Sequence, residues 1–223
     1  MGTLSIVATP IGNLGDITLR ALETLKECAV IYAEDTRVIA KLLARYEIKK
    51  PLQRLDAVTE LKKAEDVIAR LEEGEHVVFV SDAGTPGISD PGARLVASVR
   101  ARLPAATIEA IPGPSALTAA LSIAGMDTSS FTFLGFLPHK KGRQTALKEI
   151  AKSEVPVVLY ESPHRIARLL KELESLHISR VTVARELTKI HEETITGTPS
   201  EIGARFSAQP ETVRGEFVVI IVP

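Results

Sequence analysis

Two charged clusters follow short apolar runs in this sequence, and both hold groups that can bind or transfer protons. The first is Glu34-Asp35-Thr36-Arg37, and the second is Arg185-Glu186-Leu187-Thr188-Lys189. A carboxylate or amine beside a substrate hydroxyl can act as a general base. The structural alternatives are an Asp that caps the helix starting near Thr36 and a salt-bridged rim, which contributes little stability.

Small residues follow two other apolar runs. One stretch is Ser81-Asp82-Ala83-Gly84-Thr85-Pro86-Gly87, and Thr9-Pro10-Ile11-Gly12-Asn13 has the same character. Small side chains let a ligand approach the backbone, whose N–H groups bind anions such as a carboxylate. The alternative is a tight turn closed by an Asp side chain. The glycine and lysine spacings of phosphate- and dinucleotide-binding loops are missing, which disfavours nucleoside triphosphate hydrolysis and nicotinamide chemistry.

Basic residues gather in the second half of the chain. The densest run is His139-Lys140-Lys141-Gly142-Arg143, which Lys148 and Lys152 extend along an expected helix. A second basic face holds His164, Arg165, Arg168 and Lys171. Phosphate backbones bind such charges. The alternative is an ordinary solvated helix.

Composition restricts the classes of partner and reaction. The 27 Lys and Arg residues face 28 Asp and Glu residues, and Trp is absent. Proteins with a long nucleic-acid groove are usually strongly basic, so an RNA partner would meet a local basic patch. The five histidines lack ligand spacing, Cys28 is the only cysteine, and no Gly-x-Ser-x-Gly occurs. We therefore expect no metal site, no intrachain disulfide and no hydrolase nucleophile of that type.

Strands and helices are expected to alternate through the chain, which predicts two α/β domains with largely parallel sheets. The Pro112-Gly113-Pro114 cluster places the boundary between domains 1–112 and 113–223. In such sheets ligands bind at the carboxyl ends of strands, where the clusters above lie. Expected strands are 4–9, 30–33, 77–80, 107–111, 131–136, 155–160, 180–184 and 216–222. Expected helices are 16–28, 37–46, 59–73, 143–153 and 162–176, with others starting near 90 and 198.

The sequence gives no sign of a membrane. No apolar run approaches about 18 residues, the length that spans a bilayer. The N-terminus lacks a basic region before an apolar stretch, so we expect no secretory signal and a cytoplasmic location.

Nine segments together resemble the small-subunit (16S) ribosomal RNA cytidine 2′-O-ribose methyltransferases of the tetrapyrrole methylase superfamily. They run in order from residue 4 to residue 222. The segments are Thr9-Pro10-Ile11-Gly12-Asn13-Leu14, Ala33-Glu34-Asp35-Thr36-Arg37, Val80-Ser81-Asp82-Ala83-Gly84-Thr85-Pro86, Ser89-Asp90-Pro91-Gly92, Pro112-Gly113-Pro114-Ser115-Ala116, Gly135-Phe136-Leu137-Pro138, Tyr160-Glu161-Ser162-Pro163-His164-Arg165, Ala184-Arg185-Glu186-Leu187-Thr188-Lys189 and Arg214-Gly215-Glu216.

The resemblance implies two α/β domains with S-adenosylmethionine in the cleft between them, and a homodimer. No metal is needed, because the sulfonium is itself the activated leaving group. The implied cofactor contacts are Pro10, Asp82, Ala83, Gly84, Thr85, Ile88, Ser115, Ala116, Tyr160, Glu161 and Leu187.

The implied reaction is in-line methyl transfer to the 2′-oxygen of a cytidine in the decoding region of 16S rRNA. Asp35, Glu186 or Lys189 would handle the ribose proton. Arg37, Lys140, Lys141, Arg143, Arg165 and Arg185 would hold the RNA. The alternatives are a methyltransferase of the same superfamily acting on a tetrapyrrole or a modified histidine, and a non-catalytic module that binds the cofactor or the ribosome.

The sequence departs from the family pattern in two places. Relatives usually carry a His-x-His-Asn-Glu loop, whereas Leu55-Asp56-Ala57-Val58-Thr59-Glu60 retains only the final acid. Many relatives also have a C-terminal extension beyond the position of Val222-Pro223. These departures are expected to affect recognition of the target base and affinity for RNA.

Overall fold

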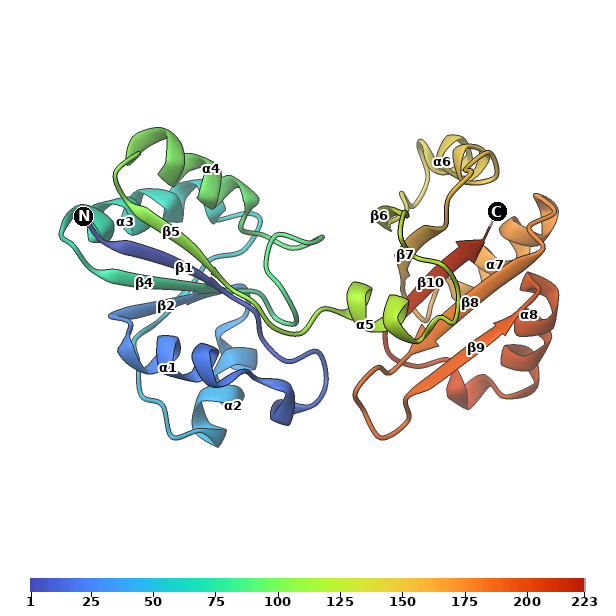
Figure 1. Ribbon diagram of the computed structural model, residues 1–223, viewed down its shortest axis with the longest axis horizontal. Helices are drawn as coiled ribbons and strands as arrows, with labels where there is room; N and C mark the ends of the chain where they lie inside the picture. Colours follow the sequence, from blue (N-terminus) through green and yellow to red (C-terminus); the bar gives the residue numbers. More distant parts are fainter. Residues whose placement is uncertain (223) are drawn as a thin grey trace. The chain divides into compact units, whose positions relative to one another are not determined.

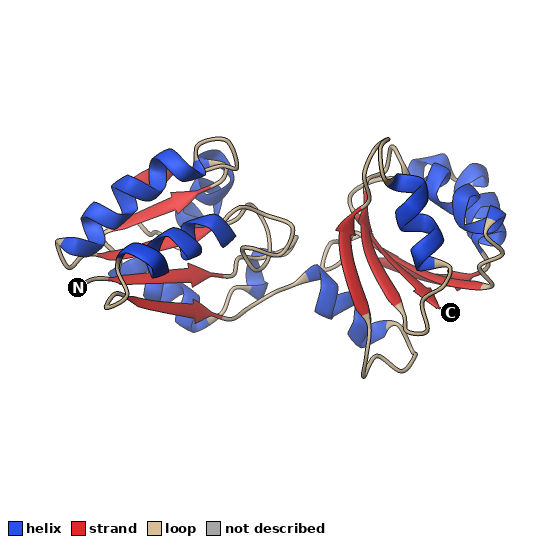
Figure 2. Ribbon diagram, turned by 90° about the horizontal axis from the view of Figure 1, so that it is seen from above, coloured by secondary structure: helices blue, strands red, loops and turns tan. Residues whose placement is uncertain are grey.

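Apolar runs form strands and amphipathic segments form helices in both halves of the chain, as their periodicity predicts (Figures 1 and 2). The computed structural model describes residues 1–222, and Pro223, the last residue of the second expected domain, lies outside them. The chain divides into two compact units, residues 1–115 and residues from 116 onward. The Pro/Gly cluster had indicated a boundary between residues 112 and 113.

The first unit is built on a fully parallel sheet with strand order β3-β2-β4-β1-β5. The strand β2 and residues 77–80 of β4 are continuous runs of buried apolar residues, typical of strands covered on both faces. The helices α1 and α2 cover one face, and α3 and α4 cover the other (Figure 1). The bounds are β1 Thr3–Val7, α1 Leu19–Glu27, β2 Val30–Ala33, α2 Thr36–Arg45, β3 Leu52–Arg54, α3 Glu60–Glu72, β4 His76–Val80, α4 Ala93–Arg102 and β5 Thr107–Ile111, with a 3₁₀ turn at Leu14–Asp16.

The second unit has a mixed sheet with strand order β6-β7-β10-β8-β9. Of its four pairings only β6–β7 is parallel, so the expectation of a largely parallel sheet is wrong here. The helices α6, α7 and α8 share one core with the sheet, while α5 contacts β10. The bounds are α5 Ala116–Ile123, β6 Thr132–Phe136, α6 Arg143–Ile150, β7 Val157–Glu161, α7 Ile166–Ser175, β8 Arg180–Arg185, β9 Glu193–Gly197, α8 Pro199–Ala208 and β10 Phe217–Val222, with a 3₁₀ turn at Pro210–Thr212.

Side-chain caps fix where several helices begin. Thr18 accepts a hydrogen bond from the Ala21 N–H at the start of α1. Thr198 and Glu201 form a capping box at the start of α8, the helix expected to start near residue 198. None of the helices within residues 1–222 is long and apolar enough to span a membrane.

The only cysteine is part of the core of the first unit. Cys28 follows α1 and is fully buried. Burial raises the pKa of its thiol to about 11. The thiol is therefore protonated at neutral pH, which excludes it as a ready nucleophile.

Candidate functional site

The loops that follow β1, β2 and β4 meet at the carboxyl edge of the first sheet. Thr9 and Gly84 exchange two backbone hydrogen bonds of 3.0 Å. The Asp35 N–H donates to Asp82 Oδ1 at 2.8 Å, which ties the loop after β2 to the loop after β4. Thr85 Oγ1 donates to the Pro114 carbonyl at 3.2 Å. Four of the sequence-predicted segments are thus brought together within this unit.

Gly84 allows this close approach. Its φ is +78°, and a Cβ there would lie 3.3 Å from Ile11 Cγ2 and 3.6 Å from the Pro114 carbonyl oxygen. A side chain would be strained by the backbone conformation and crowded by both neighbours. The small residues of the segment therefore serve the packing of the loops as well as any ligand.

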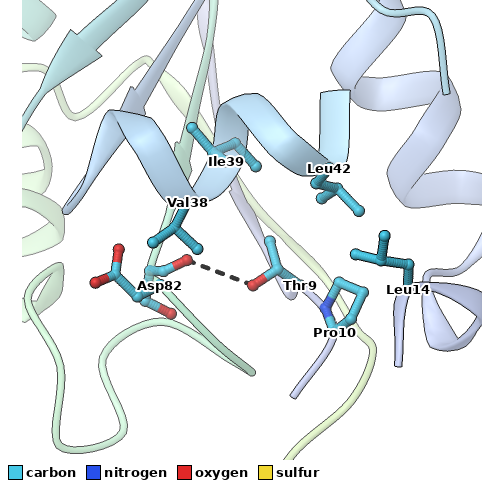
Figure 3. Close-up of a pocket in the computed structure, with 8 residues that line it drawn as sticks. Thr9, Pro10, Leu14, Val38, Ile39, Leu42 and Asp82 are labelled. Atoms are coloured by element: carbon cyan, nitrogen blue, oxygen red, sulfur yellow. Dashed lines mark hydrogen bonds between the residues drawn. The ribbon is translucent and has the colours of Figure 1, made fainter. Parts of the chain in front are cut away.

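A small cavity of about 60 Å³ opens beside these loops (Figure 3). Val38, Ile39 and Leu42 of α2 form an apolar wall. Thr9 Oγ1 donates to the Ser81 carbonyl at 3.4 Å on the opposite side. The remaining lining residues are Pro10, Leu14 and Asp82. The cavity suits an apolar group with a polar end.

Asp35 performs the structural role that the sequence left open. Its Oδ1 accepts from the Arg37 N–H at 2.9 Å and caps α2, and its Oδ2 pairs with the Arg37 guanidinium at 2.5 Å. Hydrogen bonds from the Arg37 side chain and backbone lower the pKa of Asp35 to about 2. So low a pKa makes Asp35 a weak proton acceptor. The ion pair also means that Asp35 and Arg37, both expected site residues, bind each other in this structure.

Glu34 has the opposite electrostatics. Burial raises its pKa above the ordinary value, and the negative charges of Asp82, Asp56 and Asp35 add to the effect. A raised pKa is common among catalytic carboxylates. The sequence identified the Glu34-Asp35 pair but nominated only Asp35 as a base. Sequence spacing does not reveal which of two adjacent acids is the more buried.

The carboxyl ends of β7 and β8 meet at one edge of the second sheet. Phe217, the first residue of β10, pairs with Glu161 on one side and Arg185 on the other. The turn after β8 holds Glu186 at φ +50° and Thr188 at φ +66°. Such conformations cost energy in residues other than glycine and cluster at functional sites. The edge is a candidate site on this ground.

Within that turn Lys189 Nζ donates to Glu186 Oε1 at 2.7 Å. The Glu186 carboxylate lies over Gly215, where a Cβ would be 1.8 Å from Oε1. Two of the expected catalytic residues thus form an ion pair, and the Arg214-Gly215-Glu216 segment provides the space for it.

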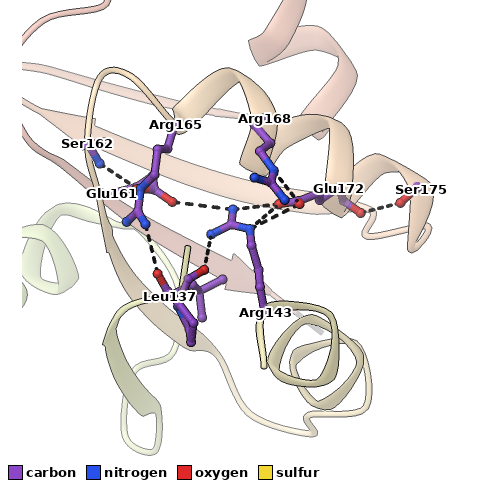
Figure 4. A network of polar contacts seen from close by, with 9 residues as sticks. Leu137, Arg143, Glu161, Ser162, Arg165, Arg168, Glu172 and Ser175 are labelled. Carbon is purple, nitrogen blue, oxygen red and sulfur yellow. Dashed lines mark hydrogen bonds and ion pairs between the residues drawn. The ribbon is translucent and has the colours of Figure 1, made fainter. Parts of the chain in front are cut away.

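The structure contradicts the role expected for Arg143. We expected it to grip RNA from an exposed loop, but its side chain is 1 % exposed. It donates to Glu172 Oε2 at 2.7 Å through Nη2 and lies 3.7 Å from Glu161 Oε2 (Figure 4). As the first residue of α6 it faces the core of the second unit. A run of basic residues does not show which one points inward.

Three other expected site residues are also engaged internally. Arg165 donates to Glu161 Oε1 at 2.6 Å and to the Leu137 carbonyl at 3.0 Å (Figure 4). Arg185 pairs with Glu193 at 2.7 Å, and its side chain is 8 % exposed. The Glu161 carboxylate is fully buried, so it is directed into the unit and away from a surface ligand.

The remaining expected residues keep a range of exposures. Tyr160 packs edge-on against Phe133 and Phe136. Lys140 and Lys141 are exposed, and Leu187 is buried. Ala83 and Ile88 are exposed, while Ser115 and Ala116 are half-buried.

Comparison with known proteins identifies the family. The profile of the tetrapyrrole (corrin/porphyrin) methylases matches residues 3–203. The chain belongs to the tetrapyrrole methylase family. This family member is 46 % identical to the ribosomal RNA small subunit methyltransferase I of Xylella fastidiosa, across 99 % of this chain and 81 % of that protein. It is 43 % identical to the protein of the same name from Thermotoga maritima, across 99 % and 98 %.

Two solved structures share the fold. A diphthine synthase aligns with a TM-score of 0.76 at 14 % identity, covering 99 % of this chain and 90 % of that one. The methyltransferase CobJ aligns with a TM-score of 0.72 at 21 % identity, covering 100 % and 94 %. The α/β fold expected from the sequence is therefore shared with both structures.

Proposed function

We propose that the chain transfers a methyl group from S-adenosylmethionine to the 2′-oxygen of a cytidine in 16S ribosomal RNA. The observation that carries the proposal is the identity of 43–46 % with proteins named ribosomal RNA small subunit methyltransferase I, across 99 % of the chain. The cytidine, the 2′-oxygen and the decoding region are what the resemblance of the nine segments to that family implies. Their loops lie at strand ends, where α/β folds bind ligands.

The carboxyl edge of the first unit fits part of such a donor. The Gly84 turn brings the loops after β1 and β4 together, and Pro10, Leu14 and Val38 supply apolar surface to the cavity beside them. The exposed Asp82 carboxylate gives the edge a negative charge, which suits a cation. When bound, the donor supplies a methyl group on a sulfonium. The proposed contacts in the second unit are Ala116, Tyr160 and Leu187.

Removal of the ribose proton requires a base, and we add Glu34 to the expected set of Asp35, Glu186 and Lys189. The raised pKa of Glu34 makes it a stronger acceptor than Asp35, whose pKa is about 2. If Glu34 is the base, its protonation causes the acid limb of the rate–pH profile, and this limb lies above the ordinary Glu range. Glu186 is held by Lys189 and is the alternative acceptor.

The Glu34→Gln variant tests this assignment. We expect kcat to fall by roughly 10²- to 10⁴-fold and the acid limb to disappear. Asp35→Asn is the matched control, because Asn also caps helices and a carboxylate with a pKa of about 2 contributes no limb near neutrality. An unchanged acid limb in Glu34→Gln assigns the proton to another residue, and Glu186→Gln is then the next variant to measure.

The substrate class implies further properties. The proposed partner is 16S rRNA or the small ribosomal subunit, the proposed assembly is a homodimer, and the proposed compartment is the cytoplasm, where ribosomes work. The lysines of the loop before α6, Lys140 and Lys141, are exposed and free to contact phosphate.

The function is tested by incubating the purified protein and labelled S-adenosylmethionine with 16S rRNA or with small subunits that lack the modification. We expect label in one cytidine, at a linkage that resists alkaline cleavage because its 2′-oxygen is methylated. Transfer to a porphyrinoid and none to RNA would instead assign a tetrapyrrole substrate. Donor binding with no methylated product on either would indicate a non-catalytic module.

A further inference from the structure

One face of α7 lines a shallow hollow of about 580 Å³ in the second unit. His164 lies in the turn before the helix, two residues ahead of its first residue, and Arg168 and Lys171 are three residues apart within the helix. This spacing places Arg168 and Lys171 on one side of the helix, and His164 borders the same hollow. Ala167, Glu172 and Ser175 complete the lining. The hollow is thus bordered by three basic side chains along its length.

The single acid in the hollow is already neutralised. Glu172 accepts from Arg143 Nε at 2.9 Å and Nη2 at 2.7 Å, and from Arg168 Nε at 2.9 Å (Figure 4). Its side chain is 15 % exposed. Burial alone would raise the pKa of Glu172, but the hydrogen bonds from both arginines outweigh it and lower the pKa. Glu172 therefore stays ionised and fully engaged.

The basic side chains on the surface remain available. Lys171 and His164 make no ion pair or side-chain hydrogen bond with any residue in the described part of the chain, and both are exposed. The Arg168 side chain is 58 % exposed, and Glu172 holds it by Nε. Its terminal amino groups are left for a ligand, and a guanidinium in this geometry can bind a phosphate through two hydrogen bonds.

The buried part of the network orients the exposed part. Arg143, which is 1 % exposed, reaches Glu172 from α6 and fixes its carboxylate (Figure 4). The same carboxylate pairs with the exposed Arg168. Arg143 Nη1 also donates to the Pro138 carbonyl at 3.4 Å, in the loop that leads to Lys140 and Lys141. The buried Arg143 thus contacts both the hollow along α7 and the loop that carries Lys140 and Lys141.

We propose that His164, Arg168 and Lys171 bind consecutive phosphates of the RNA backbone, and that Arg143 and Glu172 are positioning residues for Arg168. The proposal rests on the proposed RNA substrate and adds an interface to it. The row of basic side chains and the absence of an unpaired acid among the residues that line the hollow suit a polyanion, and the lack of Phe, Tyr or Trp among them favours backbone over base contacts.

The double variant Arg168→Ala/Lys171→Ala tests the interface. We expect affinity for 16S rRNA to fall roughly tenfold at low salt, and the slope of log K against log salt to decrease by about 1.4, since each phosphate contact on single strands contributes about 0.7. The matched control is Lys62→Ala/Arg100→Ala, which removes the same charge from exposed positions of α3 and α4 in the first unit. An RNA affinity and salt slope equal to those of the control would overturn the proposal.

Glu172→Gln tests positioning. Removing a negative charge beside a phosphate site should strengthen RNA binding by simple electrostatics, whereas loss of the Arg168 anchor should weaken it. We expect weaker binding, and no further loss when Glu172→Gln is added to Arg168→Ala. RNA binding by Glu172→Gln that is equal to or stronger than that of the wild type would contradict the positioning role. The same holds if Glu172→Gln weakens RNA binding equally in the wild type and in Arg168→Ala.

Two measurements separate failure of this interface from failure of the proposed function. Calorimetric affinity for S-adenosylmethionine should be unchanged in the Arg168→Ala/Lys171→Ala variant. Wild-type protein that methylates RNA while the double variant binds RNA normally refutes only the interface. A double variant that loses affinity for assembled subunits but not for free RNA would assign the hollow to a ribosomal protein, which also overturns it.

Discussion

At the residue scale, the site segments show close approaches that dictate residue type. Gly215 has φ +71° and lies directly beneath the Glu186 carboxylate. An added methyl group would have to displace that carboxylate and so separate it from Lys189. The two motif segments around residues 186 and 215 are therefore packed against each other, although nothing in their spacing along the chain shows it.

Gly215→Ala should lower the free energy of unfolding by about 1–2 kcal/mol, the cost of a left-handed backbone in a residue with a Cβ. It should also reduce methyl transfer, because Glu186 moves. The measurements are urea denaturation and initial rates. Gly74→Ala is the matched control, since φ is +86° there and nothing lies within 4 Å of the added Cβ. Equal activity losses in both variants would count against a functional role for the position of Glu186.

Residue roles were only partly predictable. The alternative that Asp35 caps α2 was visible from the sequence, because an Asp directly before an apolar periodic stretch is a strong N-cap signal. The inward direction of Arg143 was not visible, because it depends on the packing of α6 against α7. The raised pKa of Glu34 was not visible either, because it arises first from burial and then from the charges of acids in three different loops.

At the scale of elements, one carboxylate links two helices and a site loop. Glu60, the first residue of α3, is 4 % exposed. Its Oε1 accepts from the Gly92 N–H at 2.9 Å and the Leu95 N–H at 3.0 Å, and so caps α4. The loop between β4 and α4 carries the Asp82–Thr85 turn, so Glu60 fixes the far end of that loop. The final acid of the 55–60 segment therefore has a structural role in this chain.

Glu60→Ala should therefore destabilise the protein by about 1–3 kcal/mol, because two N–H groups in a buried region lose their acceptor. Glu60→Gln should cost less, because its amide oxygen still accepts. Glu72→Ala, at an exposed position of the same helix, is the control and should change stability little. Denaturant midpoints decide between these outcomes, and equal values for Glu60→Ala and Glu72→Ala would refute the capping role.

Strands and helices with strong apolar periodicity were predicted, and elements with weak periodicity were missed. The first-unit strands and helices match within a few residues, except β3, which has only three residues. β9 was missed because it is an edge strand with alternating exposure and few apolar residues. Its absence from the prediction also concealed the antiparallel pairing, since periodicity carries no information on strand direction.

At the scale of the whole molecule, the near-neutral net charge reflects two units that each carry exposed basic side chains. Lys62 and Arg100 are examples on the first unit, and Lys140 and Lys171 are examples on the second. The proposed contact with RNA therefore rests on where the basic side chains of the second unit lie, along α7 and in the loop before α6, and an excess of positive charge does not support it. Composition alone does not show this placement.

Binding of the donor should stabilise the folded chain. At a concentration 100 times its Kd, S-adenosylmethionine should add about 2.7 kcal/mol, because it binds the native state and not the unfolded chain. Thermal melts with increasing donor measure the effect, and S-adenosylhomocysteine serves as the product control. An unchanged Tm under saturating donor would contradict the proposed cofactor.

The buried Cys28 thiol has a practical consequence for studying the molecule. With a pKa of about 11 and no exposed surface, it should not react with maleimide dyes in the native protein. A single cysteine introduced on the surface of each unit can then be labelled without removing the natural one. Energy transfer between two such fluorophores would follow the separation of the units as donor and RNA are added.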